Sequence, residues 1–200
     1  MIESRDILQL QQKEINEILE KMINQKVRTI GRASGMLWLG LGEEIDYVDY
    51  KGRTTKKSEY ALHLQCPWRI KNTESCIVVA SYDMYEPNST TKWSEDFDWD
   101  IQGNNLYDEK VKNWFEEQDR SVIAYELKTN LDLAVTFDDG NSLEIFINTT
   151  ADVECWRFFS FRSKNDVVVS GVNVHVGTEK VYVVADPHSY CGTERLCSIN

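Results

Sequence analysis

Acidic and aromatic residues alternate in the middle of the chain, and side chains of these two types can bind a cation or a protein. The segment, here called the acidic-aromatic loop (residues 93–100), contains Trp93, Glu95, Asp96, Phe97, Asp98, Trp99 and Asp100. Carboxylates at alternate positions are typical of a calcium loop, which also needs glycine directly after its third acid and glutamate at its twelfth position. Ile101 and Tyr107 occupy those positions. The pattern therefore does not fit an EF-hand.

Two interpretations of the acidic-aromatic loop remain open. Aromatic residues dominate protein cores, so the rings could be buried while the intervening acids face water. Alternatively, rings among acids form a surface on which a basic protein docks, because aromatic anchors supply binding energy and charge directs association. On this second interpretation the candidate partner-binding residues are Trp93, Glu95, Asp96, Asp98, Trp99 and Asp100.

Histidine and cysteine raise the possibility of a zinc site at two places. The candidate ligands are His63-x-x-Cys66, His188-x-x-Cys191 and Cys197. Residues three apart on a strand point to opposite faces, so His63 and Cys66 converge only if Pro67 distorts the chain. Neither set has the paired Cys-x-x-Cys knuckle of structural zinc sites. We therefore expect no bound metal and no cofactor.

Two arginines directly follow tryptophan inside apolar segments, at Trp68-Arg69 and Trp156-Arg157. An arginine at a strand end can bind a carboxylate or phosphate through two parallel hydrogen bonds. Arg69 and Arg157, together with His63, are therefore candidates for a small-ligand site. The alternative is that each arginine lies along the sheet and pairs with a local acid.

The sequence contains none of the common catalytic motifs. It has no GxSxG elbow, no glycine-rich phosphate loop and no HExxH. Cys66 and His63 are close in sequence, whereas a catalytic Cys/His pair normally converges from distant positions. We expect a protein that is not an enzyme. The remaining alternative is a site in which His63 or His175 meets carboxylates of shifted pKa.

The elements that position these residues form an α+β pattern. Apolar residues recur at helical spacing from Glu3 to Asn24, which predicts an amphipathic helix on a sheet. A short helix is expected at Lys110–Gln118, and the predicted strands are Lys26–Ile30, Met36–Leu41, Ile45–Tyr50, Tyr60–Cys66, Cys76–Ala80, Val122–Leu127, Leu131–Phe137, Ser142–Asn148, Glu154–Phe161, Val167–Val176 and Lys180–Ala185. Cys76–Ala80 is continuously apolar, which suits a strand buried on both faces.

Turn and loop signals separate these elements. Asp138-Asp139-Gly140 predicts a hairpin turn. Pro67 lacks an amide hydrogen and is expected at a bend, bulge or edge. The basic run Arg53, Lys56 and Lys57 is expected in a solvated loop.

Length and composition predict one domain. A chain of 200 residues with 42% hydrophobic residues is sufficient for one core. Its expected parts are an N-terminal helix (1–25), a first group of strands (26–86), the loop and short helix (87–120), a β-meander (121–186) and a tail (187–200). The predicted architecture is a single α+β domain, in which the N-terminal amphipathic helix and the short mid-chain helix lie against a twisted, mainly antiparallel sheet.

Charge and cysteine content indicate the class of partner and the compartment. Lys+Arg is 22 against Asp+Glu 33, so the formal net charge is −11. Such a surface repels nucleic acids and anionic membranes and attracts basic proteins. The polar start, the absence of an apolar run of membrane-spanning length and the five scattered cysteines are typical of a cytoplasmic protein.

Several motifs occur in a characteristic order between residues 31 and 160. They are EYALHLQCPWRI, DMYEP, FDWD followed by NNLYDEK, the hairpin LAVTFDDGNSLEIF and the strand ECWRFF. This order resembles small bacterial proteins found beside polymorphic toxins, the immunity proteins. The resemblance implies a non-catalytic cytoplasmic protein that neutralises one cognate toxin by binding it. Toxins that act on nucleic acids are often basic, which fits the acidic chain. The alternative function is a small-ligand binder or sponge of the phage-defence or counter-defence type.

Overall fold

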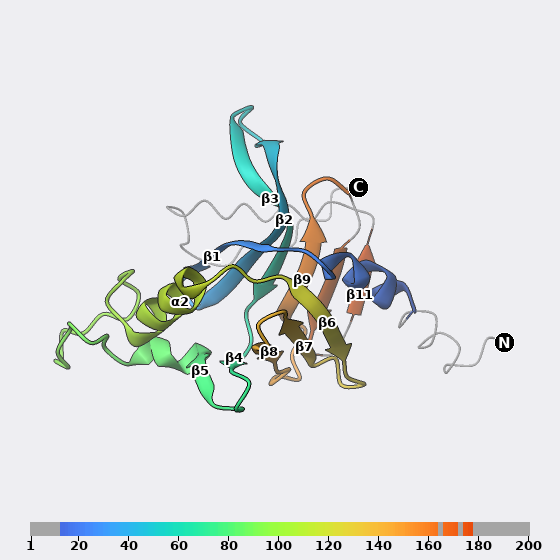
Figure 1. Ribbon diagram of the computed structural model, residues 1–200. Helices are drawn as coiled ribbons and strands as arrows, with labels where there is room; N and C mark the ends of the chain where they lie inside the picture. Colours follow the sequence, from blue (N-terminus) through green and yellow to red (C-terminus); the bar gives the residue numbers. More distant parts are fainter. Residues whose placement is uncertain (1–12, 164–165, 172–173, 178–200) are drawn as a thin grey trace.

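The structure is a computed structural model that describes residues 13–163, 166–171 and 174–177. Its strands form two antiparallel sheets (Figure 1). The six-stranded sheet contains, in spatial order, β1 (Val27–Ala33), β2 (Met36–Val48), β3 (Thr54–Leu64), β9 (Glu154–Ser160), β10 (Asp166–Ser170) and β11 (Val174–Gly177). The five-stranded sheet contains β5 (Ile77–Ala80), β4 (Trp68–Lys71), β8 (Ser142–Ile145), β7 (Leu133–Phe137) and β6 (Val122–Leu127).

One hydrophobic core contains residues of both sheets and of the helices. Leu39 and Leu62 from the six-stranded sheet belong to the same buried cluster as Ile70 and Val135 from the five-stranded sheet. Alternate residues of each strand face this core because side chains of an extended chain point to opposite faces. The α+β class and the single compact domain are confirmed. The prediction of one sheet is wrong, because hydrophobic alternation shows which face is buried but not which strands pair.

The chain passes from one sheet to the other between β3 and β4. Pro67 lies in this connection and lacks the amide hydrogen that a continuing ladder would use. Strand β5, which follows β4, forms an edge of the five-stranded sheet, and Ile77 on it is 56% exposed. The prediction that Cys76–Ala80 is buried on both faces is therefore wrong. Its apolar composition does not distinguish a central strand from an edge strand.

Strands β2 and β3 extend beyond their neighbours as a two-stranded arm (residues 43–58) that projects from the top of Figure 1. Gly42, at φ +85°, lies within the register shift where the arm begins. Lys56 and Lys57 lie opposite Asp46 and Ile45 in the ladder. The prediction of a solvated loop is therefore wrong for both lysines, which lie in strand β3. A strand accommodates basic side chains where acidic side chains of the neighbouring strand lie opposite them, as Asp46 lies opposite Lys56.

The described helices are short. Residues 13–19 are α-helical and continue into the 3₁₀ helix η1 (Glu20–Met22), within the predicted N-terminal helix. The 3₁₀ helix η2 (Ser81–Tyr85) follows β5, and α2 (Leu106–Glu117) begins four residues before the predicted start. Among the described residues, no helix combines the length and apolarity that crossing a bilayer requires.

The predicted strand Val167–Val176 is two strands, β10 and β11, separated at Gly171. A Cβ atom at Gly171 would lie 2.4 Å from the carbonyl oxygen of Thr149, so any other residue at this position would clash with the backbone. Three predictions fall outside the described residues: the strand Lys180–Ala185, the tail ligands His188, Cys191 and Cys197, and the first part of the N-terminal helix.

Candidate interaction surface

Arg32 of β1 holds the end of the acidic-aromatic loop against the start of α2. Its side chain is 3% exposed and donates to both carboxylate oxygens of Asp108, at 2.7 and 2.9 Å. It also donates to the Asp100 carboxylate at 3.3 Å and to the backbone carbonyls of Trp99 and Asp100 at 3.3 and 3.2 Å. Burial alone would lower the pKa of Arg32, but the hydrogen bond and charge of Asp108 outweigh it and the pKa is raised.

A buried asparagine fixes the same backbone from the other side. Asn105 is fully buried, caps α2 by accepting from the Asp108 amide at 2.8 Å, and donates to the Trp99 carbonyl at 2.7 Å. The Gly103 amide donates to Asp108 at 2.7 Å, with φ +81°. The loop is therefore held through its carbonyls, which leaves several of its side chains free to face solvent.

The rings of the loop divide between solvent and core. Trp93 is 67% exposed, whereas Trp99 is half-buried and packs against the hydrophobic core. Phe97 is half-buried and lies 5.9 Å from Trp93 between ring centroids. The interpretation of the rings as core residues thus applies in part to Trp99, and Trp93 remains available to a partner.

Two tyrosines of η2 extend the exposed aromatic surface, and sequence reasoning missed them. Tyr82 is 69% exposed and Tyr85 is 47% exposed. Tyr85 contacts Tyr82 edge-on at 5.8 Å and Trp99 at 5.6 Å between centroids. The available signal was the segment YDMYEP (residues 82–87), in which two tyrosines flank Asp83 and Met84 a few residues before the loop. We call Tyr82, Tyr85, Glu86, Trp93, Glu95, Asp96 and Asp98 the candidate surface.

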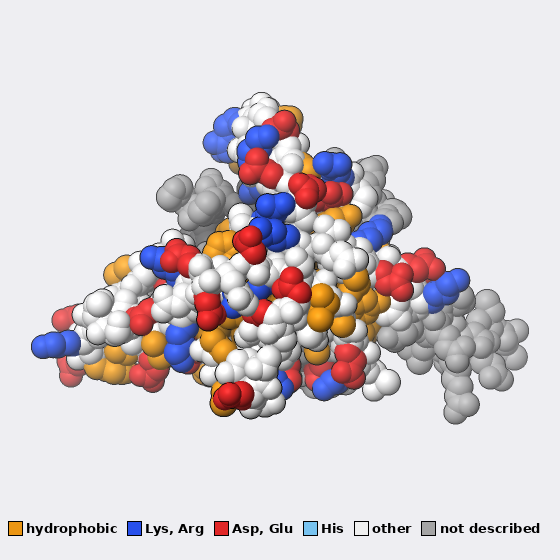
Figure 2. All heavy atoms as spheres, viewed as in Figure 1, with side chains coloured by type: hydrophobic (Ala, Val, Ile, Leu, Met, Phe, Trp, Pro, Cys, Tyr) orange, Lys and Arg blue, Asp and Glu red, His pale blue; other side chains and the backbone are white. Residues whose placement is uncertain are grey.

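The carboxylates of the candidate surface differ from those of the arm. Within the described part of the chain, Glu86, Glu95, Asp96 and Asp98 form no ion pair, and all four are exposed. On the arm, Lys56 pairs with both Glu44, at 3.7 Å, and Asp46, at 2.8 Å. Exposed rings and carboxylates without an ion pair among the described residues thus coincide at one end of the molecule, where red, orange and blue side chains intermingle in Figure 2.

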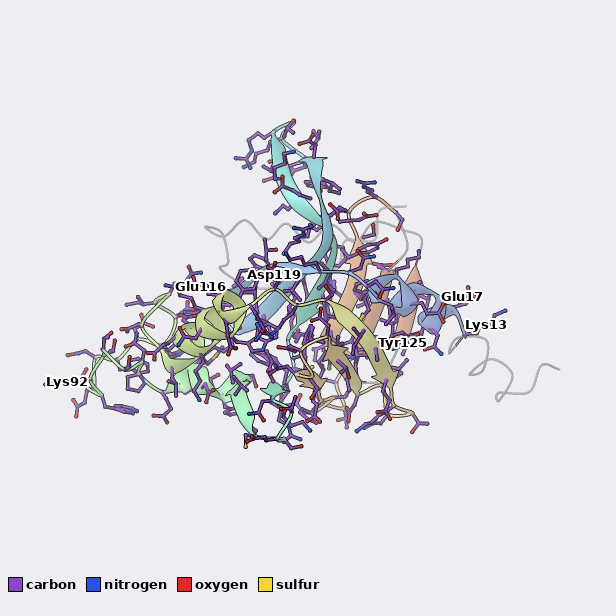
Figure 3. All side chains as sticks on the ribbon, viewed as in Figure 1. Lys13, Glu17, Lys92, Glu116, Asp119 and Tyr125 are labelled. Atoms are coloured by element: carbon purple, nitrogen blue, oxygen red, sulfur yellow. The ribbon has the colours of Figure 1, made fainter. Side chains whose placement is uncertain are left out.

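Not every predicted partner-binding residue has an exposed, unpaired side chain. Asp100 is 56% exposed in its side chain but binds Arg32, and Trp99 contributes to the core. Trp93, Glu95, Asp96 and Asp98 are exposed. Lys92, labelled in Figure 3, lies at the outer tip of this segment, far from the sheets. The structure thus separates residues that brace the loop from residues that face solvent.

The residues of the alternative ligand site lie on two different sheets. Arg69 of β4 donates to Glu144 of β8 at 2.6 Å, and its guanidinium lies 5.1 Å from the Phe146 ring. Burial alone would raise the pKa of Glu144, but Lys71 and Arg69 outweigh it and lower that pKa. Arg157 lies on β9 in the six-stranded sheet. Arg69 and Arg157 therefore do not share a ligand site on one sheet.

Arg157 and His63 do lie side by side, opposite each other across β3 and β9. Arg157 donates to Glu154 at 2.6 Å through Nε and also through Nη2. His63 is 8% exposed, and burial, followed by the charges of Arg157 and Lys57, lowers its pKa to about 3. Its Nδ1 has no hydrogen-bond partner among the described residues. The imidazole is therefore neutral at pH 7.

The described residues contain no evident metal centre, and the Cys66 thiol is not activated. They contain no group of three or more His, Cys, Asp or Glu side chains placed to hold a metal ion. Burial raises the pKa of Cys66 to about 12, so its thiolate is scarce at neutral pH. A hollow of about 230 Å³ beside α2 is lined by Val27, Trp114, Phe115, Glu116, Gln118, Asp119 and Arg120. Glu116 and Asp119 appear there in Figure 3.

Comparison of the chain with protein-family models, with curated proteins and with solved structures found no match. Geometry and charge therefore carry the functional argument.

Proposed function

We propose that this protein is a non-catalytic, cytoplasmic binding module that neutralises a basic protein partner, in the manner of an immunity protein and its toxin. The observation that carries the proposal is the candidate surface, where exposed rings lie among carboxylates that form no ion pair with any described residue. Exposed aromatic clusters on a protein surface are uncommon without a partner, and aromatic residues are the usual anchors of interfaces.

The candidate surface adjoins a braced segment of backbone. Arg32 and Asn105, whose side chains are buried, donate hydrogen bonds to the carbonyls at the end of the loop, those of Trp99 and Asp100. Bracing at this end reduces the part of the loop that a partner must order on binding, and with it the entropic cost of association. Lys110 of α2 also pairs with Asp83 of η2 at 3.3 Å, which joins the two tyrosines to the same unit.

The charge distribution favours a basic partner. Carboxylates that lack internal cations attract a positively charged protein and raise its association rate at low ionic strength. The formal net charge of −11 adds a long-range contribution of the same sign. A nucleic-acid ligand would be repelled by both.

The proposal is tested by recovering the partner from the native host with tagged wild-type protein and measuring its association with purified variants. Glu95→Gln/Asp96→Asn/Asp98→Asn should slow association at low salt by roughly tenfold, with a smaller effect at high salt. The matched control is Glu43→Gln/Glu44→Gln/Asp46→Asn on the arm, which removes the same charge. Equal slowing by both variants would exclude the candidate surface as the contact site.

A further inference from the structure

Among the described residues, two arginines are each held by an aromatic ring together with a carboxylate. The Arg120 guanidinium lies 4.4 Å from the Trp114 ring centroid and binds the carboxylates of Asp139 and Glu117. The Arg69 guanidinium lies 5.1 Å from the Phe146 ring and binds Glu144. In both cases an aromatic ring lies close to the guanidinium, and a carboxylate accepts hydrogen bonds from its N–H groups.

The candidate surface has the ring and the carboxylate of such a site, but no described cation is paired with its carboxylates. Tyr85 directly precedes Glu86 and contacts Tyr82, and Trp93 precedes Glu95 and Asp96 by two and three residues. These rings are 47–69% exposed, and the described residues place no arginine or lysine in an ion pair with these three acids. The missing component is a cation that can contact a ring and a carboxylate together.

We propose that the partner supplies arginines, which stack on Tyr82, Tyr85 and Trp93 while they bind the neighbouring carboxylates. This inference rests on the proposed function and specifies the chemistry of the partner. A planar guanidinium can stack on a ring and still donate two parallel hydrogen bonds, whereas a lysine ammonium is compact and strongly hydrated.

Within the described residues, the distances from cations to ring centroids are also shorter for arginine than for lysine. The lysines that approach rings do so less closely than Arg120: Lys51 lies 5.2 Å from the Tyr50 centroid and Lys57 lies 6.0 Å from that of Phe161. Neither of these two lysines forms an ion pair among the described residues. Within the described part of the chain, arginine is thus the cation that combines with both a ring and an acid.

The test uses N-acetylated hexaarginine and hexalysine peptides as probes, titrated into the full chain by calorimetry at one fixed low ionic strength. We expect hexaarginine to bind at least about fivefold more tightly, the equivalent of roughly 1 kcal/mol from ring contacts. Tyr82→Ala/Tyr85→Ala and Trp93→Ala should each reduce this preference. Tyr50→Ala, a 64% exposed tyrosine on the arm, should leave the preference unchanged.

Each other outcome overturns the arginine inference in a distinguishable way. Equal affinities that both fall in Glu86→Gln/Glu95→Gln/Asp96→Asn show a surface that reads charge alone, and the proposed function stands. An arginine preference that persists in the ring variants places the contact elsewhere on the protein. If neither peptide binds, the inference fails, and the proposed function is then decided by the association assay with the recovered partner.

Discussion

Arg32 and Asp108 form a two-pronged ion pair, at 2.7 and 2.9 Å, that joins edge strand β1 to the first turn of α2. The carboxylate also lies at a helix N-terminus, where negative charge is favourable. The same guanidinium binds the carbonyls of Trp99 and Asp100. One buried cation therefore connects the six-stranded sheet, α2 and the end of the acidic-aromatic loop that follows the candidate surface.

Replacing Arg32 should destabilise the protein strongly. Arg32→Ala leaves the Asp108 carboxylate, 15% exposed, without its cation, and the loss of one partner of a buried pair costs about 3–5 kcal/mol. Arg32→Lys should recover only part of this, because an ammonium cannot reproduce the forked contacts. The free energy of unfolding in urea measures both effects.

The control for this prediction is Arg28→Ala on the same strand. Arg28 pairs with Glu43 at 3.5 Å, but both side chains are substantially exposed, so its loss should cost less than about 1 kcal/mol. Equal destabilisation by Arg28→Ala and Arg32→Ala would show that the buried pair has no special role.

Asp96 and Asp100 should respond differently to the same change. Asp96→Asn should leave the free energy of unfolding within about 0.5 kcal/mol of wild type, because its side chain is exposed and unpaired among the described residues. Asp100→Asn weakens a contact to Arg32 and should lower stability measurably. With a partner or hexaarginine at low salt, Asp96→Asn should still weaken association. Identical unfolding of the two variants would contradict this division of roles.

The sequence predicted local structure well where the signal is local. β6 has the predicted bounds Val122–Leu127, and the turn at Asp138–Gly140 joins β7 to β8 with Gly140 at φ +82°. Strand alternation and a turn residue that requires positive φ are both short-range properties.

What the sequence did not predict depends on long-range pairing. The Arg32–Asp108 contact joins residues 76 positions apart, and neither residue lies in a distinctive motif. The edge position of β5 depends on which strands its neighbours pair with, and its apolar composition does not encode this. Tyr82 and Tyr85 lie on either side of buried Met84 in a short 3₁₀ helix, so their exposure depends on the tertiary packing of η2 against α2.

Thiol reactivity should separate Cys76 from the two buried cysteines. Cys76 is exposed, whereas Cys66 and Cys155 are buried and burial raises the pKa of both thiols. In a Cys191→Ser/Cys197→Ser background, which removes the cysteines outside the described residues, Ellman's reagent should modify one thiol quickly. The other two should react on unfolding in urea. Rapid reaction of more than one thiol in the folded protein would contradict the burial of β3–β4 and β9 residues.

His63 should make the protein sensitive to mild acid. Its pKa is about 3 in the folded protein, below the ordinary value of 6.5, so the unfolded chain binds a proton that the folded chain does not between these values. The stability of the wild type should therefore fall as pH decreases from about 6.5. His63→Leu removes this group, together with an imidazole Nδ1 that lacks a hydrogen-bond partner among the described residues.

Urea unfolding of both proteins at pH 7.5 and pH 5.0 measures the effect of His63 by difference. The difference in free energy of unfolding should move by roughly 2 kcal/mol in favour of His63→Leu at pH 5.0, from 1.36 kcal/mol for each pH unit below 6.5. Burial raises the pKa of nearby Asp166, which acts in the opposite direction, but this residue is present in both proteins and largely cancels. Parallel pH profiles for the two proteins would mean that His63 takes up a proton in the folded state, and that the six-stranded sheet admits water beside Arg157.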